Sequence, residues 1–282
     1  METGEPLYSP SGGHIMNPML RLHRAVFASV LCAAASFPVL AVDLAPTGTL
    51  RAAFLGDNPV QGRVDKQTGA ISGPVADLVK EFAHRLGVPY KIIPASGARE
   101  VMDLVKSGQA DIGFLAWDET RAREVDFSEP YARMHNAYLV PASSPIKKSS
   151  DADRKGVKIG AVRGQTQQIF LSEHIKNATV RIFESTPSQQ EMSKMLASGE
   201  LDVFGANRQR MEEAASKDHS LRALADDFSS VEQAVVVSKQ NAGKLPEINR
   251  FLVDVRKSGF VKDSLAQAKL IGVDVAEKYT SH

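Results

Sequence analysis

Arg121 lies in a polar turn directly behind an apolar stretch, and its type and position suit the binding of an anion. A strand is predicted over residues 111–115, and the turn that follows carries Trp117, Asp118 and Arg121. In an open α/β sheet, ligands bind at the carboxyl ends of the strands. A guanidinium offers two parallel donors that match a carboxylate, so the pattern predicts a carboxylate site. A surface arginine that pairs with Asp118 or Glu124 is the alternative interpretation.

A second turn, residues 164–167 with the sequence GQTQ, lies between a predicted strand and a predicted helix. The first backbone amides of a helix have no partner inside the helix, so they are free to bind an anion. Gln165 and Thr166 lie in this turn, and the Thr166 hydroxyl adds one more donor. The turn therefore predicts a second half of the binding site, with an ordinary helix cap as the alternative.

A helix, an SGxxD turn and a strand are encoded twice in the sequence, 91 positions apart. The first copy consists of Val101, Leu104, Val105, Ser107, Gly108, Asp111 and Ile112, and the second of Met192, Met195, Leu196, Ser198, Gly199, Asp202 and Val203. A repeated unit of this kind predicts two similar lobes. Because pockets often form where two lobes meet, we expect the ligand to bind between them.

Helical and extended patterns alternate along the rest of the chain. Pro74 suits the first turn of a helix, and Gly87 suits its end. Helices are predicted at 74–86, 98–106, 168–175, 188–197, 208–217, 245–257 and 260–268, and strands at 49–55, 90–93, 111–115, 157–162, 180–183, 201–205 and 232–238. Strands separated by helices form mainly parallel sheets. The predicted fold class is therefore α/β, with a mainly parallel sheet flanked by helices in each lobe.

Two extended segments, residues 136–141 and 232–237, are predicted to cross between the lobes. Two crossings of this kind suit a hinge. Lobe 1 is therefore predicted at residues 42–138 and 235–282, and lobe 2 at residues 139–234.

Residues 20–41 have the pattern of a secretory signal peptide. Arg21 and Arg24 precede an apolar run that ends in a small-residue cleavage site at Ala41. We therefore interpret residues 1–41 as an upstream segment and signal peptide, with cleavage after Ala41 and export to a periplasm. No later apolar run approaches the ~20 residues that span a bilayer, so we expect a soluble product.

The composition argues against several classes of function. The chain has 282 residues, 43% of them hydrophobic and 24% charged, and a net charge of +1, which does not indicate a nucleic-acid partner. The only cysteine, Cys32, lies in the predicted signal peptide, so thiol chemistry is not expected in the mature chain. The seven histidines lack metal-ligand spacing, and no phosphate loop or nucleophile elbow is present. We therefore expect no metal and no cofactor.

Four motifs in a fixed order resemble the family 3 extracellular solute-binding proteins, the receptors of amino-acid-type ABC importers. The motifs are GxxxDLxxxxAxRLG from Gly73 to Gly87, SGxxD from Ser107, RAxxVDFSxPY from Arg121 to Tyr131, and GxxxGxTxxxF from Gly160. The resemblance covers the whole mature chain. It implies a two-lobed periplasmic flytrap, a monomer, that closes on a small carboxylate-bearing solute and delivers it to a membrane permease. It also implies that Arg121 clamps the ligand's α-carboxylate and that the GQTQ turn completes the cradle.

Asn207 stands where amino-acid receptors of this family usually have an aspartate that neutralises the ligand's ammonium group. An amide does not compensate a buried positive charge, which costs several kcal/mol, so the ligand is predicted to lack an ammonium group. Ala116 and Trp117 replace small hydroxyl residues of the family. Trp117, the only tryptophan, is suited to stack on a flat ligand or to pack on the lobe surface. Asp57, in the turn after the first strand, is a candidate for the missing negative charge or a solvated turn residue.

Two other functions are compatible with the same scaffold. Periplasmic cyclohexadienyl dehydratases resemble this family and need an acid in the cleft, but neither Glu129 nor Glu212 follows the carboxyl end of a predicted strand. A sensor module that reports to a membrane kinase would need a separate partner, because this sequence has no span or kinase segment of its own. We therefore expect a binding protein rather than an enzyme.

Overall fold

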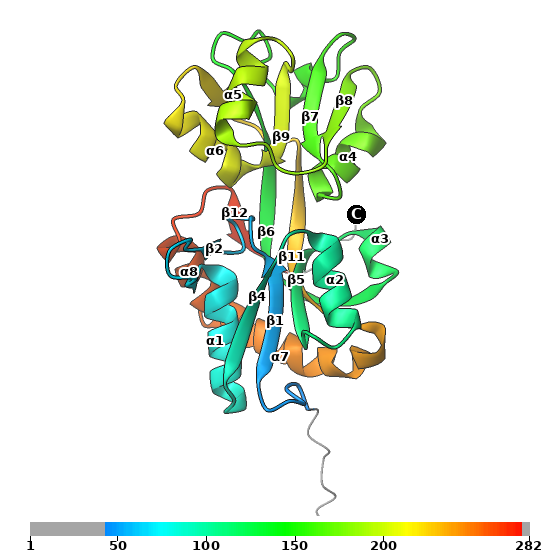
Figure 1. Ribbon diagram of the computed structural model, residues 1–282, viewed down its shortest axis with the longest axis vertical. Helices are drawn as coiled ribbons and strands as arrows, with labels where there is room; N and C mark the ends of the chain where they lie inside the picture. Colours follow the sequence, from blue (N-terminus) through cyan, green and yellow to red (C-terminus); the bar gives the residue numbers. More distant parts are fainter. Residues whose placement is uncertain (1–42, 278–282) are drawn as a thin grey trace, which may run out of the picture. The chain divides into compact units, whose positions relative to one another are not determined.

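The structure, a computed structural model, describes residues 43–277 (Figure 1), so the predicted upstream segment, signal peptide and cleavage after Ala41 lie outside the described residues. The strands are β1 (Leu50–Leu55), β2 (Arg63–Val64), β3 (Ile71–Ser72), β4 (Tyr90–Ala95), β5 (Ile112–Ala116), β6 (Val125–Pro141), β7 (Lys158–Val162), β8 (Thr179–Phe183), β9 (Val203–Asn207), β10 (Leu221–Ala223), β11 (Ser229–Ser238) and β12 (Val273–Val275). The α-helices are α1 (Pro74–Leu86), α2 (Ala98–Lys106), α3 (Glu119–Ala122), α4 (Thr166–His174), α5 (Gln189–Ala197), α6 (Arg208–Lys217), α7 (Leu245–Lys257) and α8 (Phe260–Gln267), with short 3-10 helices at Ser149–Ala152 and Lys239–Lys244.

Ten of the described strands form one continuous sheet in the order β4-β1-β5-β11-β6-β9-β7-β8, with β10 and β12 paired to β6. In lobe 1, which comprises β1 to β5, α1 to α3, α7, α8 and β12, strand β1 pairs in parallel with β4 and β5. In lobe 2, which comprises β7 to β10 and α4 to α6, strand β7 pairs in parallel with β8 and β9. The predicted α/β class with mainly parallel pairing in each lobe is therefore confirmed.

Strands β6 and β11 run from one lobe to the other (Figure 1). They pair antiparallel with each other, and their pairing shifts register beside Pro130, which has no N–H to donate. β6 begins at Val125, whereas the sequence pattern predicted an extended segment only at residues 136–141. The predicted lobe boundaries at residues 138 and 234 fall inside β6 and β11.

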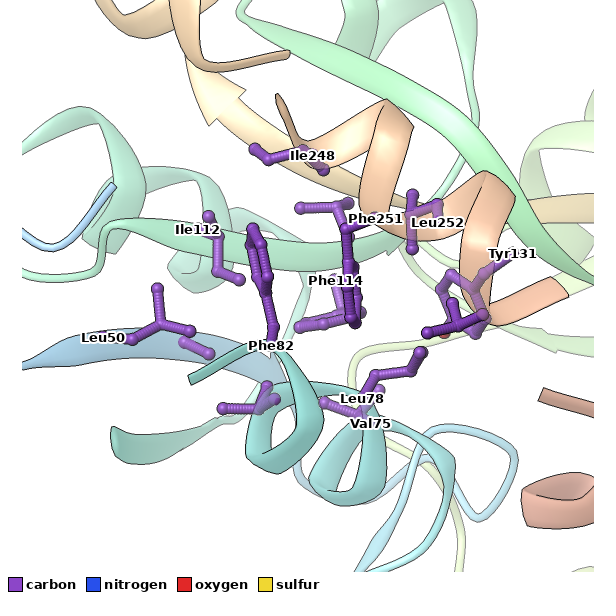
Figure 2. Close-up of a cluster of buried hydrophobic side chains, with 14 of the residues drawn as sticks. Leu50, Val75, Leu78, Phe82, Ile112, Phe114, Tyr131, Ile248, Phe251 and Leu252 are labelled. Carbon is purple, nitrogen blue, oxygen red and sulfur yellow. The ribbon is translucent and has the colours of Figure 1, made fainter. Parts of the chain in front are cut away.

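Helix α1 shows how local sequence signals place a lobe 1 element. Pro74 occupies its first turn, and Gly87 ends it in the left-handed conformation with φ 68°. Its apolar face is buried in the lobe 1 core, where Phe82 stacks on Phe251 of α7 with ring centroids 4.3 Å apart (Figure 2). Burying a side chain of this size contributes about 1.5–3 kcal/mol, so this face fixes α1 against the sheet.

The predicted repeat is visible as two aspartates in matching roles. The Asp111 Oδ2 atom accepts a 2.8 Å hydrogen bond from the Arg51 amide, and the Asp202 Oδ2 atom accepts a 2.9 Å bond from the Lys158 amide. Each aspartate thus ties the turn before its own strand to the neighbouring parallel strand of its lobe. The SGxxD motif therefore sets the register of β5 on β1 and of β9 on β7.

Several short elements were not predicted from the sequence. The β2–β3 hairpin lies in the segment that was predicted as a polar loop, and β10, β12 and α3 were not identified either. Each has only two to four residues, which is too short to show a hydrophobic period. Within residues 43–277, no helix has the length and apolar character needed to cross a bilayer.

Candidate functional site

A cavity of about 360 Å³ is lined by residues of both lobes. Its walls come from the carboxyl ends of β1, β4 and β5 in lobe 1 and of β7, β8 and β9 in lobe 2. Ligands of open parallel sheets bind at such strand ends. Six of the seven predicted site residues line this cavity: Asp57, Ala116, Arg121, Gln165, Thr166 and Asn207.

Arg121 is held in the cavity wall by the short helix α3. The Asp118 carboxylate caps this helix by accepting hydrogen bonds from the amides of Thr120 and Arg121. The Arg121 side chain points inward and is only 5% exposed. Glu124, the other partner considered for Arg121, instead pairs with Arg99 and Lys106. The interpretation of Arg121 as a surface arginine is therefore wrong.

The Arg121 guanidinium contacts neutral acceptors rather than a carboxylate. Nη1 donates to the Ala116 carbonyl oxygen at 2.9 Å, and Nη2 donates to the Gly164 carbonyl oxygen at 2.7 Å. Among residues 43–277, no aspartate or glutamate forms an ion pair with Arg121, with a carboxylate oxygen within 4.0 Å of a guanidinium nitrogen. Burial lowers the pKa of Arg121, and the charge of Asp118 opposes this shift. A guanidinium stays charged in proteins, so the cavity holds a desolvated cation that has no ion-pair partner among the described residues.

The turn between β7 and α4 faces the cavity from lobe 2. Gly164 has a left-handed backbone with φ 70°, and Gln165 is the N-cap residue of α4, without a side-chain capping bond. The amides of Thr166 and Gln167 form no hydrogen bond with another residue of the described part. The buried Gln167 side chain donates from Nε2 to Asn136 Oδ1 of β6 at 2.6 Å, which fixes the helix start beside the connecting strand. The turn thus presents free amide donors.

Asn207 is the last residue of β9 and the N-cap residue of α6. Its Oδ1 atom accepts a 2.9 Å hydrogen bond from the Arg210 amide, and its Nδ2 atom lies 3.5 Å from Asn58 Oδ1 in lobe 1. The side chain is buried at 3% exposure. Capping therefore directs the Asn207 oxygen toward the helix, and the amide contributes no charge to the cavity.

Arg210 lines the cavity and was not identified from the sequence. Its Nη2 atom lies 3.8 Å from Asp57 Oδ2 and donates to the Asp57 carbonyl oxygen. Asp57 Oδ2 also accepts a 3.2 Å bond from Thr186 Oγ1 of lobe 2. Burial lowers the pKa of Arg210, and the charges of Asp57 and Glu213 oppose this shift. The sequence signal that could have identified Arg210 is its spacing from Asn207, because position i+3 lies on the same helix face.

Trp117 is not among the residues that line the cavity. It is half-buried, and its amide donates to the Glu232 carbonyl oxygen at 2.8 Å, which pairs the end of β5 with β11. The cavity wall contains no aromatic side chain from the described residues. Stacking of Trp117 on a ligand therefore has no support from its position.

Acidic residues of the cavity are few. Its lining acids among residues 43–277 are Asp57 and Glu184, and neither Glu129 nor Glu212 is part of the wall. Glu184 pairs with Arg163 at 2.8 Å. Within the same range, no group of three or more histidine, cysteine, aspartate or glutamate side chains is arranged to hold a metal ion.

Comparisons with known proteins agree with this architecture. A family model described as bacterial extracellular solute-binding proteins, family 3, matches residues 50–267. The L-cystine-binding protein TcyJ of Escherichia coli (strain K12) is 23% identical over 211 residues, which cover 74% of this chain and 77% of that protein. The ABC transporter glutamine-binding protein GlnH of Bacillus subtilis (strain 168) is 25% identical over 207 residues, which cover 72% of this chain and 74% of that protein.

Solved structures show the same fold. A mutant of ArgBP from T. maritima superposes with a TM-score of 0.66 at 24% sequence identity, over 79% of this chain and 96% of that chain. The ancestral amino acid-binding protein AncCDT-1, described as a precursor of cyclohexadienyl dehydratase, gives a TM-score of 0.65 at 24% identity, with the same coverage of 79% and 96%. At this level of identity, these likenesses concern the arrangement of helices and strands.

Proposed function

Because the chain belongs to the bacterial extracellular solute-binding proteins, family 3, we propose that it is the substrate-binding component of an ABC importer that captures a small carboxylate-bearing solute between its lobes. Proteins of this family are periplasmic or extracellular, and the predicted export of this chain agrees with that location. Relatives named for the binding of cystine and glutamine support a role in solute binding.

The observation that carries the proposal is the burial of the Arg121 guanidinium without a carboxylate partner among the described residues. A cation that is 5% exposed, lines a cavity and has only carbonyl oxygens as described partners costs several kcal/mol of desolvation. A carboxylate placed against its free donors would form charge-assisted, bidentate hydrogen bonds. The amides of Thr166 and Gln167 at the start of α4 supply further donors from the other lobe. The arrangement therefore fits one carboxylate held by both lobes.

The proposed mechanism is closure about β6 and β11. The ligand binds to lobe 1 and lobe 2 at once, so it stabilises the closed form in proportion to its additional contacts there. Gln167 and Asn136 connect the start of α4 to β6, and this link supports the proposal that the turn before α4 moves with the hinge. The closed form would then be the one that the membrane permease recognises, and the receptor would act as a monomer.

Binding rather than catalysis is favoured by the charges of the cavity. The two lining acids face arginines, and the pKa of Glu184 is lowered by its hydrogen bonds and charge interaction with Arg163. A general acid needs a raised pKa to hold its proton near neutral pH. We therefore expect no consumption of prephenate or arogenate by the purified protein, and measurable turnover would favour a dehydratase instead.

The proposal is tested by thermal unfolding with a panel of carboxylates, amines and sugars. At a hundredfold excess over Kd, a bound ligand stabilises the native state by about 2.7 kcal/mol. We expect stabilisation by carboxylates only, and its loss in Arg121→Ala. Arg123→Ala is the matched control, because Arg123 is 71% exposed and pairs with Glu119 outside the cavity. Stabilisation that persists in Arg121→Ala, or that no carboxylate produces, would contradict the proposal.

A further inference from the structure

The walls of the cavity are positively charged. Four arginines line it, Arg99, Arg121, Arg163 and Arg210, against the two acids Asp57 and Glu184, so its formal charge is +2. The two least exposed of these six charged side chains are both arginines. Arg121 is 5% exposed, and the Arg210 side chain is 23% exposed. The other four side chains, Asp57, Arg163, Arg99 and Glu184, are 47%, 58%, 65% and 76% exposed, so water screens them more strongly.

Both acids of the wall already face an arginine. Glu184 is bound by Arg163 through Nε at 2.9 Å and Nη2 at 2.8 Å. Asp57 faces Arg210 at 3.8 Å and accepts a hydrogen bond from Thr186. An ammonium group in this cavity would meet two desolvated guanidinium groups, and each carboxylate of the wall that it reached would already face an arginine. A ligand with an ammonium group is therefore disfavoured by the charges of the wall.

Arg210 has donors to spare for a ligand. Its side chain forms one hydrogen bond in the described part of the chain, to the Asp57 carbonyl oxygen, and its contact with the Asp57 carboxylate is long at 3.8 Å. A guanidinium has five N–H donors, so most of those of Arg210 are open to another acceptor. Arg210 belongs to lobe 2 and Arg121 to lobe 1. The two cations thus approach the cavity from opposite lobes.

We infer that the ligand is a small, non-aromatic dicarboxylate without an ammonium group, with one carboxylate on Arg121 and the other on Arg210. The inference rests on the proposed function and specifies its ligand class. Two carboxylates bring the formal charge of +2 on the lining to zero. The apolar side chains Leu55, Ala98 and Val162, without any aromatic ring among the lining residues, suit a short aliphatic chain between the two acidic groups.

The test compares ligands of equal chain length that differ in one group. Calorimetry on the wild type would use the unbranched C4 to C6 dicarboxylates, the monocarboxylates of the same length, and glutamate and glutamine. We expect the best dicarboxylate to bind about tenfold or more tightly than its monocarboxylate, in keeping with one additional charge-assisted pair. Glutamate and glutamine are expected to bind more weakly than the best dicarboxylate.

Variants of Arg210 assign the second carboxylate to this residue. Arg210→Gln is expected to lose the advantage of the dicarboxylate, about tenfold or more, while monocarboxylate affinity changes by less than about threefold. Arg210→Lys keeps the charge and is expected to retain part of the advantage. Arg181→Gln is the matched control, since Arg181 of β8 pairs with Glu200 and does not line the cavity. Unfolding curves without ligand show that each variant is folded.

The outcomes separate this inference from the proposed function. If an amino acid binds most tightly, or if Arg210→Gln weakens monocarboxylates as much as dicarboxylates, this inference is wrong while carboxylate capture at Arg121 stands. If no carboxylate binds to the wild type, the proposed function fails and this inference fails with it.

Discussion

The Arg121 Nη2 atom donates a 2.7 Å hydrogen bond to the Gly164 carbonyl oxygen, so the buried guanidinium of lobe 1 directly contacts the turn before α4 in lobe 2. A carbonyl oxygen is a neutral acceptor and leaves the charge of the guanidinium uncompensated. The same contact orients Arg121 beside the start of α4, where the Thr166 and Gln167 amides lie. The donors for a carboxylate are therefore positioned by contacts within the protein.

Arg121→Lys tests whether planar geometry matters in addition to charge. Lysine keeps a positive charge but cannot form two parallel hydrogen bonds with a carboxylate. The loss of a charge-assisted hydrogen bond costs about 1.5–3 kcal/mol, so we expect roughly 10- to 100-fold weaker carboxylate binding. Calorimetry on Arg121→Lys and on the exposed control Arg123→Lys measures this. An affinity within twofold of the wild type would show that charge alone suffices.

Much of the fold could be predicted from the sequence because strong local signals mark the long elements. The predicted bounds of α1 and α2 match the structure, since Pro74 and Gly87 delimit α1 and Ser107-Gly108 follow α2. The amino-terminal half of β6 was missed because Pro130 and polar residues interrupt its period. Its extended conformation is set by pairing with β11, which is a contact distant in sequence.

Some residues of the candidate site could be predicted and others could not, depending on whether their position is set by the local sequence or by contacts distant in sequence. Arg121 and Thr166 follow strands directly, so the general geometry of α/β sheets places them at the cavity. Trp117 follows the same strand as Arg121 but lies outside the cavity wall, whereas Ala116, one position earlier in the chain, lines the cavity. The contact of Arg210 with Asp57 joins two residues that are 153 positions apart. No local sequence pattern encodes such a pair.

Tyr131→Phe is expected to leave the protein at least as stable as the wild type. The Tyr131 hydroxyl is buried without a hydrogen-bond partner in the described part of the chain, and burial raises the pKa of this side chain. The Tyr131 ring packs edge-on against Phe114, with ring centroids 5.8 Å apart, within the cluster of Figure 2. A phenylalanine ring keeps this packing. Removing an unpaired hydroxyl is expected to raise the free energy of unfolding by up to about 1 kcal/mol. A loss of more than about 1 kcal/mol in urea unfolding would indicate a partner for the hydroxyl.

Asp153→Asn is expected to make stability less dependent on acid pH. The Asp153 carboxylate accepts hydrogen bonds from the amides of Ala178, Asn177 and Lys176, and these bonds lower its pKa. A carboxyl with a lowered pKa in the native state stabilises it above the ordinary aspartate pKa of about 3.9, and this contribution is lost as the pH falls further. The variant should therefore be less stable at pH 7, with the difference shrinking toward pH 3. Equal differences at both pH values in thermal unfolding would contradict this.

Gly113→Ala tests the packing that supports the lobe 1 side of the cavity. A Cβ atom at Gly113 of β5 would lie 2.7 Å from Val101 Cγ1 and 3.0 Å from Val105 Cγ2, both on α2. Because overpacking a core typically costs 1–3 kcal/mol, we expect the free energy of unfolding to fall by about that amount. Gly243→Ala is the control, since nothing lies within 4 Å of its added Cβ, and its stability should be unchanged or up to about 1 kcal/mol higher. Equal stability of the two variants would mean that α2 shifts on β5 at little cost, and carboxylate affinity would then report whether the cavity wall moves with it.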